Sequence, residues 1–284
     1  MSEGFGLGPA ILFCPADRPE RFGKALERAD AVIVDLEDAV LPDARPAARE
    51  AVLGARLDPD RAILRVNPAG SADFAADVRT LEASGLRYVM LAKAETREQV
   101  RALAGYRVIA LVETALGVVN APAIAAEENV VALMWGAEDL IASLGGTASR
   151  HSGGRGTGDD GGAALGAYRS VPAQARAQVR LAAGAYGKAA IDAVYLDVRD
   201  HVGLVAEVED AVAQGFAATA CIHPGQVEVI RAGYRPSPEQ LEWARALLAE
   251  AEERAGAFTF RGQMVDEVVL KKARLLAGRG GAGI

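Results

Sequence analysis

The stretch from residue 88 to residue 135 contains three short apolar runs, Tyr88–Ala92 (YVMLA), Val108–Val112 (VIALV) and Val130–Trp135 (VVALMW). Each run is continuously apolar and does not alternate between apolar and polar side chains. This pattern is typical of parallel strands that are covered by helices on both faces. The segments between the runs are rich in alanine and amphipathic, as expected for helices that connect parallel strands. The stretch therefore predicts repeated strand–helix units.

The same alternation continues towards both ends of the chain. Five further apolar runs bring the total to eight: Ala10–Cys14, Ala31–Leu36, Ala62–Val66, Ala193–Val198 and Thr219–Ile222. Eight parallel strands joined by right-handed helical crossovers can close into a barrel. A doubly wound open sheet is the alternative, but the first run leads into Pro15–Pro19 (PADRP), which is not a glycine-rich phosphate-binding loop. We therefore predict an α/β protein, a (β/α)8 TIM barrel with additional C-terminal helices.

Two segments depart from the strand–helix rhythm. Helical patterns at Pro238–Ala255 and Met264–Ala277 go beyond what a barrel needs. We predict one barrel domain over residues 1–284, in which residues 237–284 form a C-terminal helical extension that contacts a neighbouring subunit or covers the barrel. A loop-like segment at residues 145–166, which includes a glycine-rich run at residues 152–162, follows the sixth strand and is either a mobile lid or a disordered segment. The sequence leaves its role open.

The composition narrows the class of protein. The chain is 51% hydrophobic and 24% charged, as globular domains are, and its formal net charge of −7 argues against general nucleic-acid binding. No run approaches the roughly 20 apolar residues of a membrane span, and the first residues lack the basic start of a signal peptide. Two cysteines form no disulfide framework, which favours a reducing compartment. We therefore expect a cytoplasmic protein without membrane or nucleic-acid partners.

Charged side chains follow most of the predicted strands, and in a barrel these positions meet at the rim where active sites lie. Glu113 and Asp139 follow the adjacent fifth and sixth strands. Two such oxygen donors can share one Mg²⁺ and leave positions for waters and substrate oxygens. The scarcity of histidine and cysteine disfavours zinc and copper. Arg65, in the third strand, is suited either to a bidentate contact with a substrate carboxylate or to an ion pair with the acidic residues after the second strand.

The motifs taken together resemble those of the citrate lyase β-subunit-like family of HpcH/HpaI aldolases. They occur in the family's order and span nearly the whole chain, from about residue 11 to residue 277. The matching pieces are Leu12–Phe22 (LFCPADRPERF), Asp35–Val40 (DLEDAV), Arg65–Asn67 (RVN), Lys93–Glu95 (KAE), Leu111–Gly117 (LVETALG), Trp135–Leu140 (WGAEDL), Cys221–Gln226 (CIHPGQ) and Gly262–Asp266 (GQMVD).

This resemblance implies a (β/α)8 barrel and a magnesium-dependent carbon–carbon lyase. Such enzymes cleave or form β-hydroxyacyl thioesters such as citryl-, malyl- or citramalyl-CoA. The expected products are acetyl-CoA or another acyl-CoA and a 2-oxo acid such as oxaloacetate, pyruvate or glyoxylate. The alternatives are the β subunit of a citrate lyase complex that acts on a carrier-protein thioester, an aldolase that acts on free 2-oxo acids, a lyase with an added thioesterase step, and a non-catalytic binding subunit.

The resemblance also implies roles for individual residues. Glu113 and Asp139 correspond to the metal ligands, and Arg65 corresponds to the residue that binds the carboxylate of the 2-oxo acid. Glu37 and Asp38 resemble an acidic pair that holds metal-bound waters, and with the arginine they are expected among the catalytic residues.

The other implied site residues follow the sixth strand or lie in the C-terminal extension. Gly136 and Ala137 complete the substrate-binding set. Asp266 resembles a catalytic acid/base residue that relatives deliver from an adjacent subunit, which implies a homo-oligomer and favours a trimer. Lys93 is expected to be a structural residue or a charge partner, because the implied chemistry needs no Schiff base.

Contacts to CoA are the least specific part of the prediction. Arg18, Arg21 and Lys24 follow the first strand and are candidate contacts for the CoA phosphates, although a basic cluster at a helix start is more often plain surface. The sequence leaves open the acyl group, the 2-oxo acid, the stereochemistry and the choice between CoA and an acyl-carrier protein.

Overall fold

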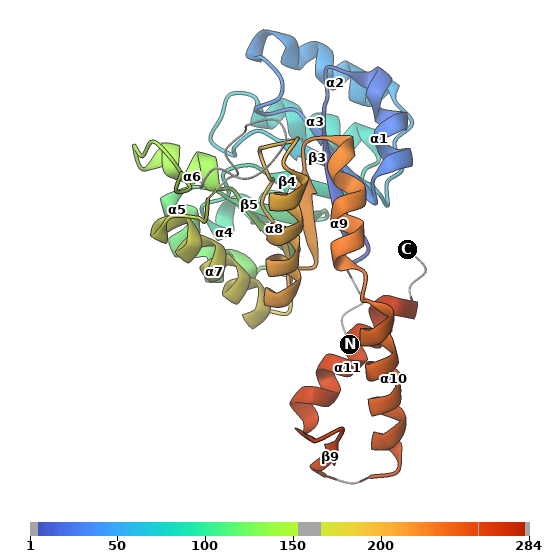
Figure 1. The fold of residues 1–284 in the computed structure, drawn as a ribbon. Coiled ribbons are helices and arrows are strands. Elements are labelled where there is room, and N and C mark those ends of the chain that lie inside the picture. Colours follow the sequence, from blue (N-terminus) through green and yellow to red (C-terminus); the bar gives the residue numbers. More distant parts are fainter. Residues whose placement is uncertain (1–4, 153–165, 255, 282–284) are drawn as a thin grey trace. The chain divides into compact units, whose positions relative to one another are not determined.

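The computed structural model describes residues 5–152, 166–254 and 256–281. Eight strands in this part of the chain pair in sequence order, all parallel, and close into a barrel (Figure 1). The strands are β1 (Ala10–Pro15), β2 (Ala31–Asp35), β3 (Ala62–Val66), β4 (Tyr88–Leu91), β5 (Arg107–Val112), β6 (Val130–Trp135), β7 (Ala189–Asp192) and β8 (Ala218–Cys221). The predicted (β/α)8 barrel is confirmed.

Helices alternate with the strands and cover the outside of the barrel (Figure 1). They are α1 (Phe22–Arg28), α2 (Arg45–Gly54), α3 (Phe74–Ser84), α4 (Arg97–Arg101), α5 (Ala115–Ala125), α6 (Ala137–Ser143), α7 (Ser170–Ala185), α8 (His201–Gln214) and α9 (Val227–Tyr234), with 3₁₀ turns η1 (Pro19–Arg21), η2 (Pro42–Ala44) and η3 (Pro224–Gln226). Gly85 and Gly215 end α3 and α8 with φ of 72° and 82°, a conformation that glycine adopts without a steric penalty.

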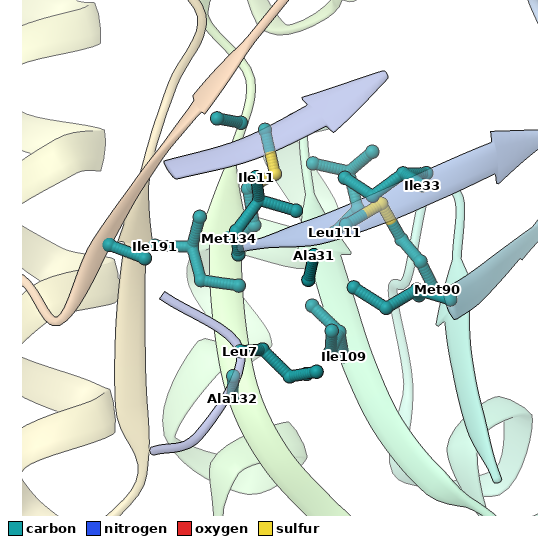
Figure 2. Close-up of a cluster of buried hydrophobic side chains, with 13 residues drawn as sticks. Leu7, Ile11, Ala31, Ile33, Met90, Ile109, Leu111, Ala132, Met134 and Ile191 are labelled. Atoms are coloured by element: carbon teal, nitrogen blue, oxygen red, sulfur yellow. The ribbon is translucent and has the colours of Figure 1, made fainter. Parts of the chain in front are cut away.

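Side chains from the strands fill the inside of the barrel (Figure 2). The cluster combines branched and sulfur-containing side chains with small alanines, so that layers from opposite strands fit together. Its buried members are Leu7, Ile11, Ala31, Ile33, Ile63, Met90, Ile109, Leu111, Ala132, Met134, Ile191, Ala218 and Ala220. Each of the larger side chains contributes about 1.5–3 kcal/mol by leaving water. The interior is therefore a packed core that holds the strand ends, and the residues on them, in fixed positions.

The prediction of a seventh strand at Ala193–Val198 is wrong, because β7 is Ala189–Asp192. This short strand pairs with β6 on one side and with β8 on the other. The longer apolar run follows it as a loop, in which the carbonyl of Tyr195 accepts a hydrogen bond of 2.8 Å from Gln226. The polar residue Asp192 can end this strand because Trp135 and Arg176 donate hydrogen bonds to its buried carboxylate, and the short run before it supplies the residues that pair with β6 and β8.

The C-terminal residues form a second compact unit, Arg231–Ile284. It contains α10 (Pro238–Glu252) and α11 (Glu267–Gly281), which lie side by side (Figure 1), and a hairpin of β9 (Phe258–Phe260) and β10 (Gln263–Val265). Its buried core consists of Ala244, Leu247, Phe260, Val265 and Ala273. The additional C-terminal helices are thus present, but the prediction that the second helix begins at Met264 is wrong, because this residue pairs in the hairpin.

Two further predictions concern membranes and the glycine-rich segment. Among the described residues, no helix combines the length and the apolar character needed to cross a membrane. The segment 152–162 lies outside the described residues, except for Ser152.

Candidate active site

A cavity of about 340 Å³ lies at the carboxyl-terminal rim of the barrel. Its apolar wall is formed by Phe13, Leu111, Met134, Trp135, Ala193, Val194, Leu196 and Ile222. The lining includes six of the predicted site residues, the charged Asp38, Arg65, Glu113 and Asp139 and the small Gly136 and Ala137. A mixed wall with a few convergent polar groups is typical of small-molecule sites. The structure therefore brings most of the predicted site together in one cavity.

The guanidinium of Arg65 is held by the carboxylates of β2 and the residues after it. Its Nε and Nη2 donate to the two carboxylate oxygens of Asp35 at 2.6 and 2.5 Å, and its Nη1 lies 2.9 Å from an oxygen of Glu37. Burial alone would lower the pKa of Arg65, but these carboxylates raise it above its ordinary value. The ion pair considered as an alternative therefore exists, and it orients a permanently charged group in the cavity wall.

Glu37 and Lys93 form a second ion pair beside the first. The Lys93 ammonium donates to Glu37, which is 3% exposed, and lies 3.5 Å from Asp38 Oδ2. Burial raises the pKa of Glu37, while Arg65 and Lys93 oppose this shift. Glu37 therefore lies behind the cavity wall and contacts both cations of the site.

Glu113 is buried at the end of β5, and its environment disfavours the ionised form. Burial, followed by the nearby charge of Asp139, raises the pKa of Glu113 to about 8. The backbone N–H of Lys93 donates to Glu113 Oε1 at 3.1 Å, and the Lys93 ammonium lies 3.9 Å from the same oxygen. A cation bound at this position would favour the carboxylate form and oppose the effect of burial.

Gly136 lies so close to Glu113 that a side chain has no room. A Cβ at residue 136 would lie 2.8 Å from Glu113 Oε2 and 2.9 Å from Glu113 Cβ. Gly136 has φ of −129° and ψ of 121°, so its backbone conformation would suit any residue. Space, and not backbone freedom, therefore requires glycine at this position.

The donor set at this rim fits a magnesium ion. Asp139 Oδ1 and Glu113 Oε1 lie 3.3 and 3.9 Å from the same lysine nitrogen, so both face one point. Among the residues that the structure describes, no three histidine, cysteine, aspartate or glutamate side chains are grouped so as to hold a metal ion. Mg²⁺ is commonly bound through one or two carboxylates, with waters and substrate oxygens in the other positions. A pair of carboxylates beside an open cavity meets that requirement.

The structure does not place the predicted CoA contacts in the cavity wall. Arg18, Arg21 and Lys24 lie in and around η1 and α1, which follow β1 at the same end of the barrel. The Arg18 and Arg21 side chains are 56% and 62% exposed and each lies 3.8 Å from a neighbouring carboxylate. Exposed pairs at this distance are weak, so these guanidinium groups can turn towards another anion.

Asp266 belongs to the second unit, where it begins α11. Its Oδ1 accepts hydrogen bonds from the backbone N–H groups of Val268 and Val269 at 3.0 and 3.1 Å. This arrangement caps the helix. Its role as an acid/base residue stays a prediction.

A buried hydrogen-bond network around Asp192 supports the cavity wall and was not predicted from the sequence. Asp192, at the end of β7, accepts hydrogen bonds from Trp135 Nε1 at 2.6 Å and from Arg176 at 3.0 and 2.7 Å. Burial raises the pKa of Asp192, and Arg176 opposes this. Trp135 also packs edge-on against Tyr168, with ring centroids 5.0 Å apart. The sequence does contain a signal for β7: like β2, it is a short apolar run that ends in aspartate.

Comparison with known proteins agrees with this geometry. Residues 10–224 match the family model of HpcH/HpaI aldolase/citrate lyase. The chain is 51% identical, over 96% of each chain, to a citrate lyase subunit beta-like protein of Mycobacterium tuberculosis (strain CDC 1551 / Oshkosh). It is 30% identical to the human mitochondrial citramalyl-CoA lyase, over 93% of this chain and 83% of the human protein.

A solved structure extends the likeness to three dimensions. It is that of a Mycobacterium tuberculosis protein in complex with magnesium, acetoacetate and coenzyme A. The two chains superpose with a TM-score of 0.88 at 51% identity, over 97% of this chain and 98% of the other. The barrel, the ordered motifs and these matches lead to one conclusion: this chain belongs to the HpcH/HpaI aldolase/citrate lyase family.

Proposed function

We propose that this chain cleaves a β-hydroxyacyl-CoA of the citryl-, malyl- or citramalyl-CoA type into an acyl-CoA and a 2-oxo acid. The coarser activity follows from its family: the chain is a magnesium-dependent lyase. The observation that carries the finer proposal is the rim cavity, in which Glu113 and Asp139 face one point beside the oriented guanidinium of Arg65. The 2-oxo acid part is oxaloacetate, pyruvate or glyoxylate.

Glu113 and Asp139 would hold the magnesium ion, and Arg65 would bind the substrate carboxylate. Bound magnesium would supply Lewis acidity at the oxygen on which negative charge develops. Arg65 uses Nε and one hydrogen of Nη2 on Asp35, and its Nη1 faces Glu37, so one N–H on each terminal nitrogen is left for a ligand in the cavity. This fixed orientation would place the substrate carboxylate next to the two metal ligands.

The remaining predicted residues are assigned roles that fit their positions. Asp38 lines the cavity and, with Glu37 behind it, would accept hydrogen bonds from waters at the metal. Gly136 leaves room for Glu113. Ala137 lines the cavity with a small side chain, which would leave space for the substrate.

The chemical step needs a proton acceptor and a proton donor. The substrate hydroxyl gives its proton to a carboxylate, the carbon–carbon bond breaks, and the bonding electrons form the enolate of the thioester. The same carboxyl group then returns the proton to the enolate carbon, and we assign both transfers to Asp266, delivered from an adjacent subunit by residues 237–284. The assignment implies a homo-oligomer, with a trimer favoured.

The thioester end of the substrate would extend out of the cavity. Arg18, Arg21 and Lys24 lie at the same end of the barrel and could pair with the phosphates of CoA. The acyl group of a carrier-protein thioester would bind in the same cavity, so the cavity does not distinguish CoA from a carrier protein. An assay has to distinguish the two.

A substrate panel tests the proposal. Purified protein with Mg²⁺ would receive malyl-, citramalyl- and citryl-CoA, and the release of 2-oxo acid and acyl-CoA would be followed with and without EDTA. We expect cleavage of one thioester, loss of cleavage in EDTA, and a loss of at least about 100-fold in Asp266→Ala. Release of free CoA alone would indicate a thioesterase. No cleavage of any CoA thioester would refute the proposal and favour a carrier-protein or free-acid substrate.

A further inference from the structure

Lys93 has an unusual backbone at the end of β4. Its φ is 49°, in the left-handed region that residues with a side chain rarely adopt. Its N–H donates to Glu113 Oε1, 3.1 Å away. Strained backbone of this kind persists where surrounding contacts enforce it, and it is concentrated at functional sites. The backbone of Lys93 thus marks this residue as part of the site.

The Lys93 ammonium lies in the middle of four carboxylates. It donates to Glu37, and its Nζ lies 3.3 Å from Asp139 Oδ1, 3.5 Å from Asp38 Oδ2 and 3.9 Å from Glu113 Oε1. Its side chain is 29% exposed, so it is partly shielded from solvent. One cation thus contacts both proposed metal ligands and both members of the acidic pair.

This arrangement has two electrostatic consequences. Ionised carboxylates that converge on one point repel one another, and a positive charge between them removes much of that repulsion. The same ammonium disfavours the binding of a divalent cation to Glu113 and Asp139. It repels the cation, and it already neutralises part of the negative charge of the two carboxylates.

We propose that Lys93 is an internal counter-ion of the metal centre, which holds the carboxylates together in the metal-free protein and competes with Mg²⁺ for Glu113 and Asp139. The inference rests on the proposed function, because it takes these two residues as the metal ligands. Lys93 is then a positioning residue and forms no covalent bond to substrate.

A plain structural ion pair makes the opposite prediction. If Lys93 only supported the geometry of Glu37 and Asp38, its removal would loosen the site and weaken metal binding. A competing counter-ion has the reverse effect, because its removal leaves the carboxylates with a larger net negative charge. The sign of the change in metal affinity therefore separates the two roles.

The experiment measures Mn²⁺ binding by the loss of the free-ion EPR signal and Mg²⁺ binding by calorimetry, without substrate. The proteins are the wild type, Lys93→Met, Lys93→Arg and the matched control Lys188→Met. Lys188 precedes β7 at the opposite end of the barrel, where it donates to the carbonyl of Glu127 at 3.0 Å. This control removes the same charge without touching the rim.

We expect Lys93→Met to bind both ions at least about tenfold more tightly than the wild type, because it loses a positive charge within a few ångströms of the site. Lys93→Arg keeps the charge and should stay within about threefold of the wild type, as should Lys188→Met. In EDTA, Lys93→Met should melt several degrees below the wild type, and saturating Mg²⁺ should narrow that gap.

Equal or weaker metal binding by Lys93→Met, with a native circular dichroism spectrum, would overturn the inference while leaving the proposed metal site intact. If Lys93→Met does not fold, Lys93→Gln is measured in its place, and the same comparison decides. If the wild type binds neither ion, the metal site itself fails, and the proposed function fails with it.

Discussion

Replacing Gly136 with alanine tests whether the position of Glu113 depends on the space beside it. The new Cβ would lie 2.8 Å from Glu113 Oε2 and 2.9 Å from Glu113 Cβ, well inside ordinary van der Waals contact at 3.4–4 Å. Glu113 is only 3% exposed, so it cannot move into solvent. Overpacking of this kind costs about 1–3 kcal/mol. The backbone of Gly136 would accept alanine without strain, so the whole effect comes from the contact with Glu113.

The assay compares Gly136→Ala with Gly54→Ala as a matched control. Gly54 ends α2, is exposed, and a Cβ there would meet nothing within 4 Å. The control should be neutral or stabilising by about 0.5–1 kcal/mol. Urea unfolding in EDTA should show Gly136→Ala less stable than the wild type by about 1–3 kcal/mol, and calorimetry should show weaker Mg²⁺ binding. Equal unfolding free energies for the two variants, together with unchanged Mg²⁺ affinity, would refute the tight packing of Glu113 against residue 136.

Three further predictions concern the charged groups of the rim and the network behind it. The pKa of Glu113 is raised from 4.5 to about 8, so its protonation stabilises the folded state at low pH, and this stabilisation is lost as the pH rises towards 8. In urea unfolding, the free energy of unfolding of the metal-free protein should fall by up to about 5 kcal/mol between pH 4.5 and 8, relative to Glu113→Gln. Parallel pH profiles for the two proteins would contradict this. Arg176→Met leaves the carboxylate of Asp192 buried without its main partner and should lower the unfolding free energy by about 3–5 kcal/mol, whereas a loss below about 1 kcal/mol would show that the pair is not needed. Glu113→Gln and Asp139→Asn should each weaken Mg²⁺ binding at least about tenfold in calorimetry, and wild-type affinity in both variants would exclude the proposed ligands.

The fold was predictable because its signal repeats along the chain. Runs such as Ala62–Val66 and Val130–Trp135 are buried on both faces, so they are apolar throughout and stand out from the amphipathic helices. The seventh strand was missed because its apolar run has only three residues before Asp192. The hairpin Phe258–Val265 was missed because its two strands have three residues each, too few for a periodic pattern to develop.

The cavity was predictable in part, because strand order alone brings strand ends together. Arg65 lies in β3, and Glu113 and Asp139 follow β5 and β6, so a barrel closed in sequence order must place them on one arc. The position of the Lys93 ammonium was not predictable, because it is defined by contacts with residues that follow three other strands. The need for glycine at residue 136 was hidden for a similar reason: it comes from a contact between two strand ends and not from a local turn.

The stoichiometry of a single cleavage reaction tests the central claim most directly. A thioester that the protein consumes would be followed by mass spectrometry, with acyl-CoA and 2-oxo acid quantified from the same sample, in Mg²⁺ and in EDTA. A magnesium-dependent carbon–carbon lyase releases the two products in equal amounts, and only when the metal is present. Thioester consumption that continues in EDTA, or that yields free CoA without an equivalent of 2-oxo acid, would contradict the account.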